Sequence, residues 1–219
     1  MSPRRIRELR GPVLNQLDEG QQIKLGNEIM RWQIFNIIHG EQGVLNLSTS
    51  LAEILLGAGA REYATNQARE EARHVAGFCH YKRDSWGMAY PVGDVLGDLI
   101  KAPVVYKNLV GMQTLLEGLA MRAFPNCRKH ARDPVLRRPV LLVMTGEAFD
   151  QKFGKTWTDK TTCNLSAEEW DRVEGCPTEY LESLLFHFVK IRQKLMVCEQ
   201  FGLDWEWVRD AIRETYNDT

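Results

Sequence analysis

Apolar residues recur at every third or fourth position along most of the chain, which is the period of an α-helix that buries one face. The first such stretch covers about 19–56 and predicts one long helix, in which Gly40 and Gly43 weaken the pattern locally without ending it. The small residues "GAGA" at 57–60 predict a break, and a second helix follows at about 61–85. Together these two helices are expected to form an antiparallel hairpin.

Two further helical stretches predict a second hairpin, at about 104–124 and 134–154. Pro103 stands where proline favours the start of a helix. The segment "PNCRKHARDP" at 125–134 has the composition of a turn between the two helices. Pro139 lies inside the fourth stretch and predicts either a kink or a first-turn boundary.

The C-terminal third also has a helical pattern. Ser166 and Glu169 have the spacing of a capping box at a helix start. Helices are expected at about 167–174, 178–201 and 204–216. Because no segment alternates as a strand does, the predicted class is all-α. We predict a single domain, residues 1–219, with a four-helix bundle over about 20–155 and additional helices over about 166–216.

The composition limits the kinds of partner. Of the 219 residues, 28 are basic and 29 acidic, giving a formal charge of -1, and neither sign forms a long block. This balance argues against binding to nucleic acid or to an anionic membrane. No run approaches the ~20 apolar residues of a membrane span. The balanced charge instead favours a small-molecule substrate. The five cysteines are odd in number and form no C-x-x-C pair, so we expect neither a disulfide framework nor a thiolate zinc site. This use of cysteine fits a cytoplasmic protein.

The segment "QAREEARHVAGFCHY" at 67–81 carries the first candidate chemistry. Glu71 and His74 lie three residues apart on a predicted helix, so their side chains share one face, and their neighbours on that face are apolar. Counted from the loop between the first two helices, Glu41 lies at a similar distance on the partner helix. Antiparallel packing should therefore bring Glu41 level with Glu71 and His74. Such an arrangement presents several ligands to one metal ion.

The second hairpin repeats this spacing. Glu117 and Glu147 are separated by the same number of residues as Glu41 and Glu71. A dimetal carboxylate site in a four-helix bundle uses one Glu from each of two helices and a Glu-x-x-His from each of the others. The predicted metal ligands are Glu41, Glu71, His74, Glu117, Glu147 and Asp150, and no catalytic residue beyond them is predicted. Five buried acids would be costly to ionise together without cations.

The ligand segments resemble those of the ferritin-like diiron carboxylate superfamily, and most closely its oxygenase-type and oxidase-type members, over roughly 30–155. The resemblance is carried by "HGEQG", "EEARHVAGFCHY", "LLEGLAMRAF" and "GEAFDQKFG". It implies an antiparallel ferritin-like bundle, two iron ions or their manganese or mixed counterparts, and O2 as co-substrate. It also implies that Glu71 and Glu147 bridge the ions while Glu41 and Glu117 are terminal. A reductase or ferredoxin as electron donor and a homodimer are compatible with it.

One position departs from the family pattern, because Asp150 stands where the superfamily has the second histidine. An aspartate ligates iron or manganese, yet it adds a negative charge and has a shorter reach. Asp150 is therefore either a ligand or an acceptor beside the metal; in the second case His80 and His187 are the remaining imidazoles. Two roles stay open for Tyr63 and Tyr81: they either form a radical or simply pack in the helical core with a hydrogen-bonded hydroxyl.

The function expected from these residues is O2-dependent oxidation or oxygenation of a small organic substrate. Three alternatives stay open. A ferroxidase or other iron-handling protein would use the same ligands. A catalytically silent member would have lost the second metal at Asp150 and act as a binding or partner subunit. A helical scaffold without metal would leave the matched spacing of the two hairpins unexplained.

Overall fold

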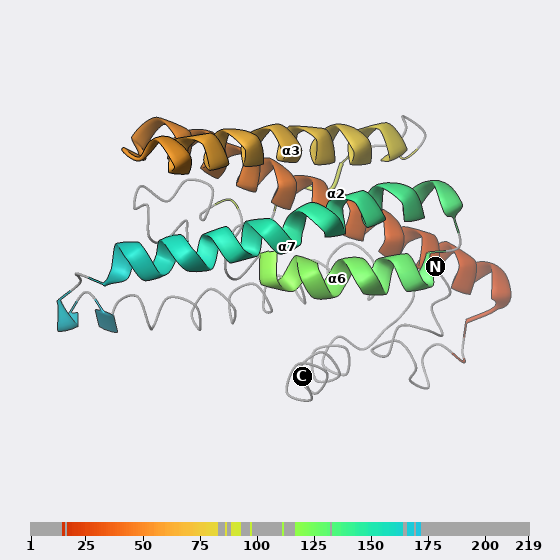
Figure 1. Ribbon diagram of the computed structural model, residues 1–219. Helices are drawn as coiled ribbons and strands as arrows, with labels where there is room; N and C mark the ends of the chain where they lie inside the picture. The colour runs from red at the N-terminus through yellow and green to blue at the C-terminus, as the bar shows by residue number, and fades with distance from the viewer. Residues whose placement is uncertain are drawn as a thin grey trace. The chain divides into compact units, whose positions relative to one another are not determined.

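The computed structural model describes residues 15, 17–82, 86, 89–92, 97, 111, 117–131, 133–163, 166–168 and 170–171. Within them lie four long α-helices: α2 (Glu19–Ile54), α3 (Ala58–Lys82), α6 (Glu117–His130) and α7 (Pro134–Thr162) (Figure 1). These described residues contain no strand, so the predicted all-α class is confirmed. No helix among them is both long and apolar enough to cross a membrane.

The first hairpin forms as the pattern predicts. A reciprocal capping box precedes α2, in which the Gln21 backbone N–H donates to Asp18 Oδ1 at 2.8 Å and the Asp18 N–H donates to the Gln21 side chain at 2.9 Å. Helix α3 begins at Ala58, slightly before the expected start. Arg61 donates to the backbone carbonyl oxygens of Leu55 and Glu53. The guanidinium thereby satisfies acceptors left open at the end of α2.

The predicted turn at 125–134 is wrong. Helix α6 continues through Pro125 to His130, and the connection to α7 is much shorter. Pro125 alone disfavours the continuation of a helix. Cys127, two residues later, is buried, and its burial favours the helical conformation that turns it inward. Helix α7 then starts as expected, with Asp133 as its N-cap accepting from the Val135 backbone N–H at 2.8 Å.

Helix α7 extends to Thr162, past the predicted end near Gly154. Aromatic packing continues along it, because the Phe153 ring stacks on Tyr63 with centroids 3.8 Å apart and lies 5.8 Å from Trp157. These contacts outweigh the cost of about 1 kcal/mol for a glycine inside a helix. The predicted start of the third helix near 104 and the C-terminal helices beyond 171 lie outside the described residues.

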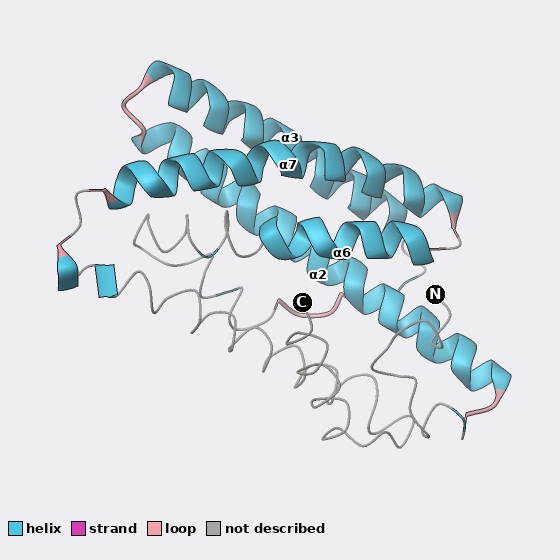
Figure 2. Cartoon of the chain, turned by 60° about the horizontal axis from the view of Figure 1, so that its bottom comes forward, coloured by secondary structure: helices cyan, strands magenta, loops and turns pink. Residues whose placement is uncertain are grey.

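Helix α7 packs against both α6 and α3, as the two views in Figures 1 and 2 show. Phe78 of α3 and Phe124 of α6 stack with ring centroids 6.2 Å apart, and both are buried. Residues 34–184 form one compact unit that contains all six candidate ligands, while residues 1–33 belong to another. The single-domain prediction for 1–219 stays a prediction.

Candidate metal centre

The candidate ligands lie on the buried stripes of their helices. On α3 the buried residues follow a spacing of three and four: Ala64, Gln67, Glu71, His74 and Phe78. On α7 the stripe Leu136, Val140, Val143, Glu147, Asp150 and Phe153 has the same period. The period that buries the apolar side chains also turns the acids and the histidine inward. All six predicted ligands are at most 7% exposed.

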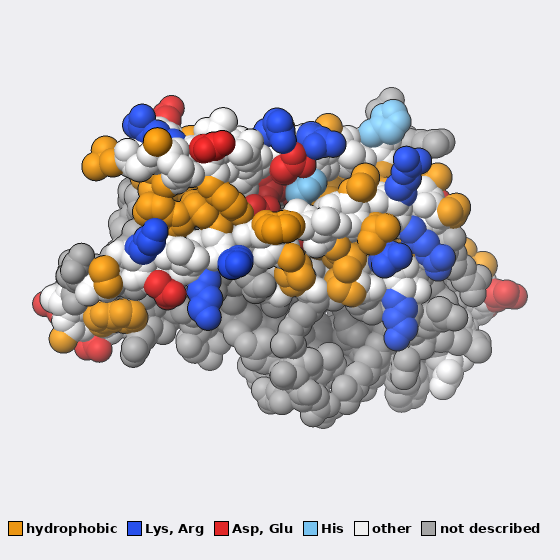
Figure 3. All heavy atoms as spheres, in the orientation of Figure 1, with side chains coloured by type: hydrophobic (Ala, Val, Ile, Leu, Met, Phe, Trp, Pro, Cys, Tyr) orange, Lys and Arg blue, Asp and Glu red, His pale blue; other side chains and the backbone are white. Residues whose placement is uncertain are grey.

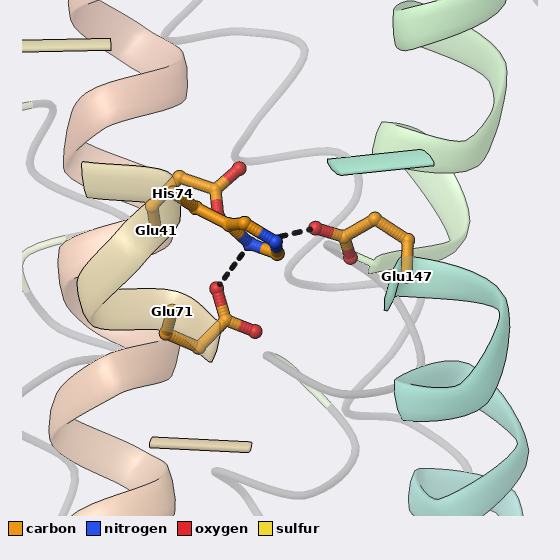
Figure 4. Close-up of side chains that lie close together, drawn as sticks. All are labelled: Glu41, Glu71, His74 and Glu147. Atoms are coloured by element: carbon orange, nitrogen blue, oxygen red, sulfur yellow. Dashed lines mark hydrogen bonds and ion pairs between the residues drawn. The ribbon is translucent and has the colours of Figure 1, made fainter. Parts of the chain in front are cut away.

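Four of the six converge, from three helices. His74 Nδ1 lies 3.0 Å from Glu41 Oε2, 3.1 Å from Glu71 Oε2 and 3.8 Å from Glu147 Oε1 (Figure 4). One donor atom of each of the four residues lies within 4.8 Å of all the others. The contact between Glu41 and His74 agrees with the prediction that the two residues lie at similar distances from the loop between α2 and α3. Three carboxylates therefore surround one imidazole nitrogen.

The electrostatics of this group oppose full ionisation of its acids. Burial, and then the charge of Glu71, raise the pKa of Glu41 well above its ordinary value. Burial together with the charges of Glu41 and Glu71 raises the pKa of Glu147 to about 10. Burial disfavours a charged His74, but its hydrogen bond to Glu71 and the surrounding negative charges outweigh burial and raise its pKa. Without another cation, protons on Glu41 and Glu147 relieve the repulsion among the acids, and a bound metal ion would take the place of these protons.

Two carboxylate oxygens of the group are buried without a hydrogen-bond partner among the described residues: Glu71 Oε1 and Glu147 Oε2. Buried acceptors normally have a partner, and leaving one unsatisfied costs about 1–3 kcal/mol. A coordinated cation would satisfy both oxygens. The two unsatisfied oxygens and the raised pKa values of the acids therefore both favour a bound cation.

The spacing of the donors fits a transition-metal ion. Adjacent ligands at right angles around an ion with bonds of about 2.1 Å lie about 3 Å apart. The two shortest distances from His74 Nδ1, 3.0 and 3.1 Å, are hydrogen bonds to Glu41 and Glu71, and they are also compatible with that value. A set of three carboxylates and one imidazole suits iron or manganese, whereas thiolate ligands are the mark of structural zinc. Of the described cysteines, Cys79 and Cys163 are exposed, and Cys127 is buried outside the group.

Asp150 lies beside the group and has an identified partner. Its Oδ1 accepts a hydrogen bond from the Tyr63 hydroxyl at 2.8 Å. Burial raises the pKa of Asp150 to about 6; the Tyr63 bond lowers it and the charge of Glu71 raises it further. Burial and the charge of Asp150 in turn raise the pKa of Tyr63. Asp150 therefore acts as an acceptor for Tyr63, while its role as a metal ligand stays a prediction.

The remaining predicted positions stand apart from the group of four. Glu117, the first residue of α6, is 3% exposed, and its Oε1 has no hydrogen-bond partner within the described part of the chain. Its role as a ligand also stays a prediction. Of the reserve imidazoles, His80 is exposed and His187 lies outside the described residues. The Tyr81 hydroxyl donates to Asp133 at 3.0 Å, at the start of α7.

Two buried polar residues near the centre were not anticipated. Gln67 lies one turn before Glu71 and is 2% exposed, and neither its amide oxygen nor its nitrogen has a partner among the described residues. Ser48 lies two turns after Glu41 and is fully buried, with its hydroxyl equally unsatisfied. Their spacing of four and seven residues from the ligands was the available signal. They extend the polar interior toward the loop between α2 and α3.

Gly146 gives the imidazole its space. A Cβ at this position would lie 3.3 Å from His74 Cε1 and 3.5 Å from its Nε2, whereas a Cβ at Gly77 of α3 would meet nothing within 4 Å. Gly77→Ala should stabilise the protein by about 0.5–1 kcal/mol through helix propensity. Gly146→Ala should gain less and weaken metal binding about tenfold by displacing His74. Urea unfolding and metal titration of both variants provide the check; equal behaviour of the two would contradict the close approach.

The likeness of the chain to diiron carboxylate proteins lies in its ligand pattern and its helical class. The structure groups Glu41, the Glu-x-x-His pair of α3 and Glu147, which belong to that pattern. The family itself stays a hypothesis that rests on these residues. Comparison of the chain with protein-family models, with curated proteins and with solved structures finds no match.

Proposed function

We propose that the chain is a dimetal carboxylate oxidoreductase, with iron as the preferred metal, that uses O2 to oxidise or oxygenate a small organic substrate. The observation that carries this proposal is the convergence of Glu41, Glu71, His74 and Glu147 in a buried helical interior. The complete architecture would be an antiparallel ferritin-like four-helix bundle with additional C-terminal helices. Manganese or a mixed pair of ions is the alternative metal content.

The four grouped residues would hold the metal, with Asp150 and Glu117 extending the set to a second ion. The number of carboxyl groups supports two ions, because the five acids of the set are buried and His74 is the one imidazole grouped with them among the described residues. Bound iron would supply the redox equivalents and an open coordination position for O2. Shared carboxylates are suited to this chemistry because they neutralise two adjacent cations and change their binding mode readily.

The protein's own side chains would control the surroundings of the metal. Val143 lies one helical turn before Glu147 and is 2% exposed. Phe78 and Phe124 are also buried, and with Val143 they would provide apolar walls that exclude water from the reacting atoms. The Tyr63 hydroxyl holds Asp150 by a hydrogen bond to Oδ1, which orients the carboxylate toward the interior. A reductase or ferredoxin would deliver electrons to the site.

Oxygen consumption tests this proposal. Iron-loaded protein, reduced without oxygen and then mixed with O2, should consume about one O2 per reduced pair of irons. Glu147→Gln should abolish this uptake, because it weakens a ligand of the grouped set. The control Lys152→Gln replaces an exposed residue of the same helix and should leave the O2 uptake unchanged. The measurement is made with an oxygen electrode while iron retained by the protein is followed by its absorbance.

The outcomes of this experiment separate the alternatives. Uptake that accelerates with an added organic compound, together with retained iron, supports an oxygenase or oxidase. Uptake with release or accumulation of Fe³⁺ and no response to any organic compound would replace the proposal with a ferroxidase or iron-handling protein. No uptake by a fully iron-loaded protein would leave a catalytically silent member that serves as a binding or partner subunit.

A further inference from the structure

Basic side chains gather around a groove at the end of the second hairpin, far along α6 and at the start of α7. The groove has a volume of about 550 Å³. Its cations are Arg128, Lys129, Arg137 and Arg138. Figure 3 shows Lys and Arg side chains concentrated over this end of the two helices. None of the six candidate metal ligands lines the groove, so it is a separate feature of the molecule.

The charge of the four cations is not offset by ion pairs within the described part of the chain. None of them forms an ion pair with a residue that the structure describes, whereas Arg73 on α3 pairs with Glu70 at 3.0 Å. Arg137 Nε donates to the Ala131 carbonyl oxygen at 2.8 Å, which fixes its guanidinium at the rim. Asp133 is the nearest acid in sequence, but its two oxygens accept from Val135 N–H and the Tyr81 hydroxyl. The groove therefore concentrates positive charge that an anion would neutralise.

The shape and lining of the groove limit the class of anion. Its volume falls within the range of about 300–1,000 Å³ that is usual for small-molecule sites. Leu141 and Met144 contribute an apolar wall beside the cations. Guanidinium groups bind phosphate through paired hydrogen bonds, and the apolar wall would cover an organic group attached to it. A long nucleic acid would require a continuous basic track, and the chain as a whole carries a net charge of -1.

We infer that this groove binds a small organic phosphate monoester, with the phosphate between the arginines and the organic group against Leu141 and Met144. The binding is independent of the metal centre and of the proposed oxidase activity. Because the cations are exposed, the affinity should fall as salt is added. A phosphate ester would thus be recognised by charge and by apolar contact together.

Calorimetric titration of the full chain with phenyl phosphate tests the inference. Phenyl phosphate should bind more tightly than inorganic phosphate, and phenol should show no binding. The double variant Arg128→Gln/Arg138→Gln should weaken phenyl phosphate about tenfold or more. The control Lys152→Gln/Lys155→Gln removes the same charge from exposed positions farther along α7 and should change the affinity less than about twofold.

Several results would overturn the inference. Equal losses in the two double variants would indicate a general charge effect, and equal binding of inorganic phosphate would remove the organic ester. Absence of phenyl phosphate binding would contradict the inference as a whole. This includes the case in which an acidic peptide or an oligonucleotide binds to the groove instead. Circular dichroism of each variant verifies that the fold is retained. Metal content serves as a second readout, and it should not change in either variant.

Discussion

Glu71→Gln should change two properties of the protein in opposite directions. Metal affinity is expected to fall by about 100-fold, because the neutral amide loses an anionic ligand in the centre of the group. The metal-free protein is expected to become more stable by about 1–2 kcal/mol at pH 8, because the charge of Glu71 raises the pKa of both Glu41 and Glu147 and its removal relieves that repulsion. Glu41 Oε2 remains 3.0 Å from His74 Nδ1 and keeps a hydrogen-bond partner for the imidazole.

Glu70→Gln provides the matched control. Glu70 precedes Glu71 on α3 but is exposed, and it pairs with Arg73 at 3.0 Å on the surface. Its replacement should leave metal affinity unchanged and alter stability by less than about 1 kcal/mol. Isothermal titration with Fe²⁺ or Mn²⁺ and urea unfolding of the metal-free variants provide the two measurements. A Glu71→Gln protein that binds metal normally, or loses metal-free stability, would contradict the assigned role of the cluster.

Removal of metal should make the stability of the protein fall as the pH rises. A carboxyl group with a raised folded-state pKa takes up a proton on folding between its unfolded and folded pKa values, so the free energy of unfolding decreases through that interval. For Asp150 this interval ends at about 6, and for Glu147 at about 10. The raised pKa of His74 acts in the same direction, since its stabilising charge is lost at higher pH.

The metal-bound protein should respond differently, because metal and protons compete for the same oxygens. The metal-free protein is expected to lose a few kcal/mol of unfolding free energy between about pH 5 and pH 8. The increase in Tm on addition of Mn²⁺ should therefore be small at the lower pH and largest at the higher one. Thermal scans with and without metal across this range measure the difference. A metal-induced shift that is independent of pH would contradict the buried carboxylate cluster.

Much of the convergence of Glu41, Glu71, His74 and Glu147 could be predicted, because side chains on helices follow the period that buries apolar residues. Glu71 and His74 share a stripe with Phe78, so the position of any one of them fixes the faces of the others. The length of the first hairpin then placed Glu41 beside His74, since the rise per residue is constant in a helix. Glu147 joined the group through the equivalent spacing on α7.

The features that the pattern did not predict depend on contacts between distant segments. Proline and glycine disfavour helix locally, yet α6 passes through Pro125 and α7 through Gly154, because buried Cys127 and the stacked Phe153 favour helix there. The pairing of Tyr63 with Asp150 joins residues 87 positions apart, and periodicity carries no information about such a bond. Helix ends follow tertiary packing more closely than local propensity.

Elemental analysis of the chain purified from iron-supplemented cells measures how many metal ions the buried cluster holds. We expect about two iron ions per chain in the intact protein, about one in Asp150→Ala and almost none in Glu71→Ala/His74→Ala. Retention of the fold in each variant is verified by circular dichroism. One ion per chain in the intact protein would contradict the dimetal centre, and absence of any transition metal would contradict the metal site as a whole.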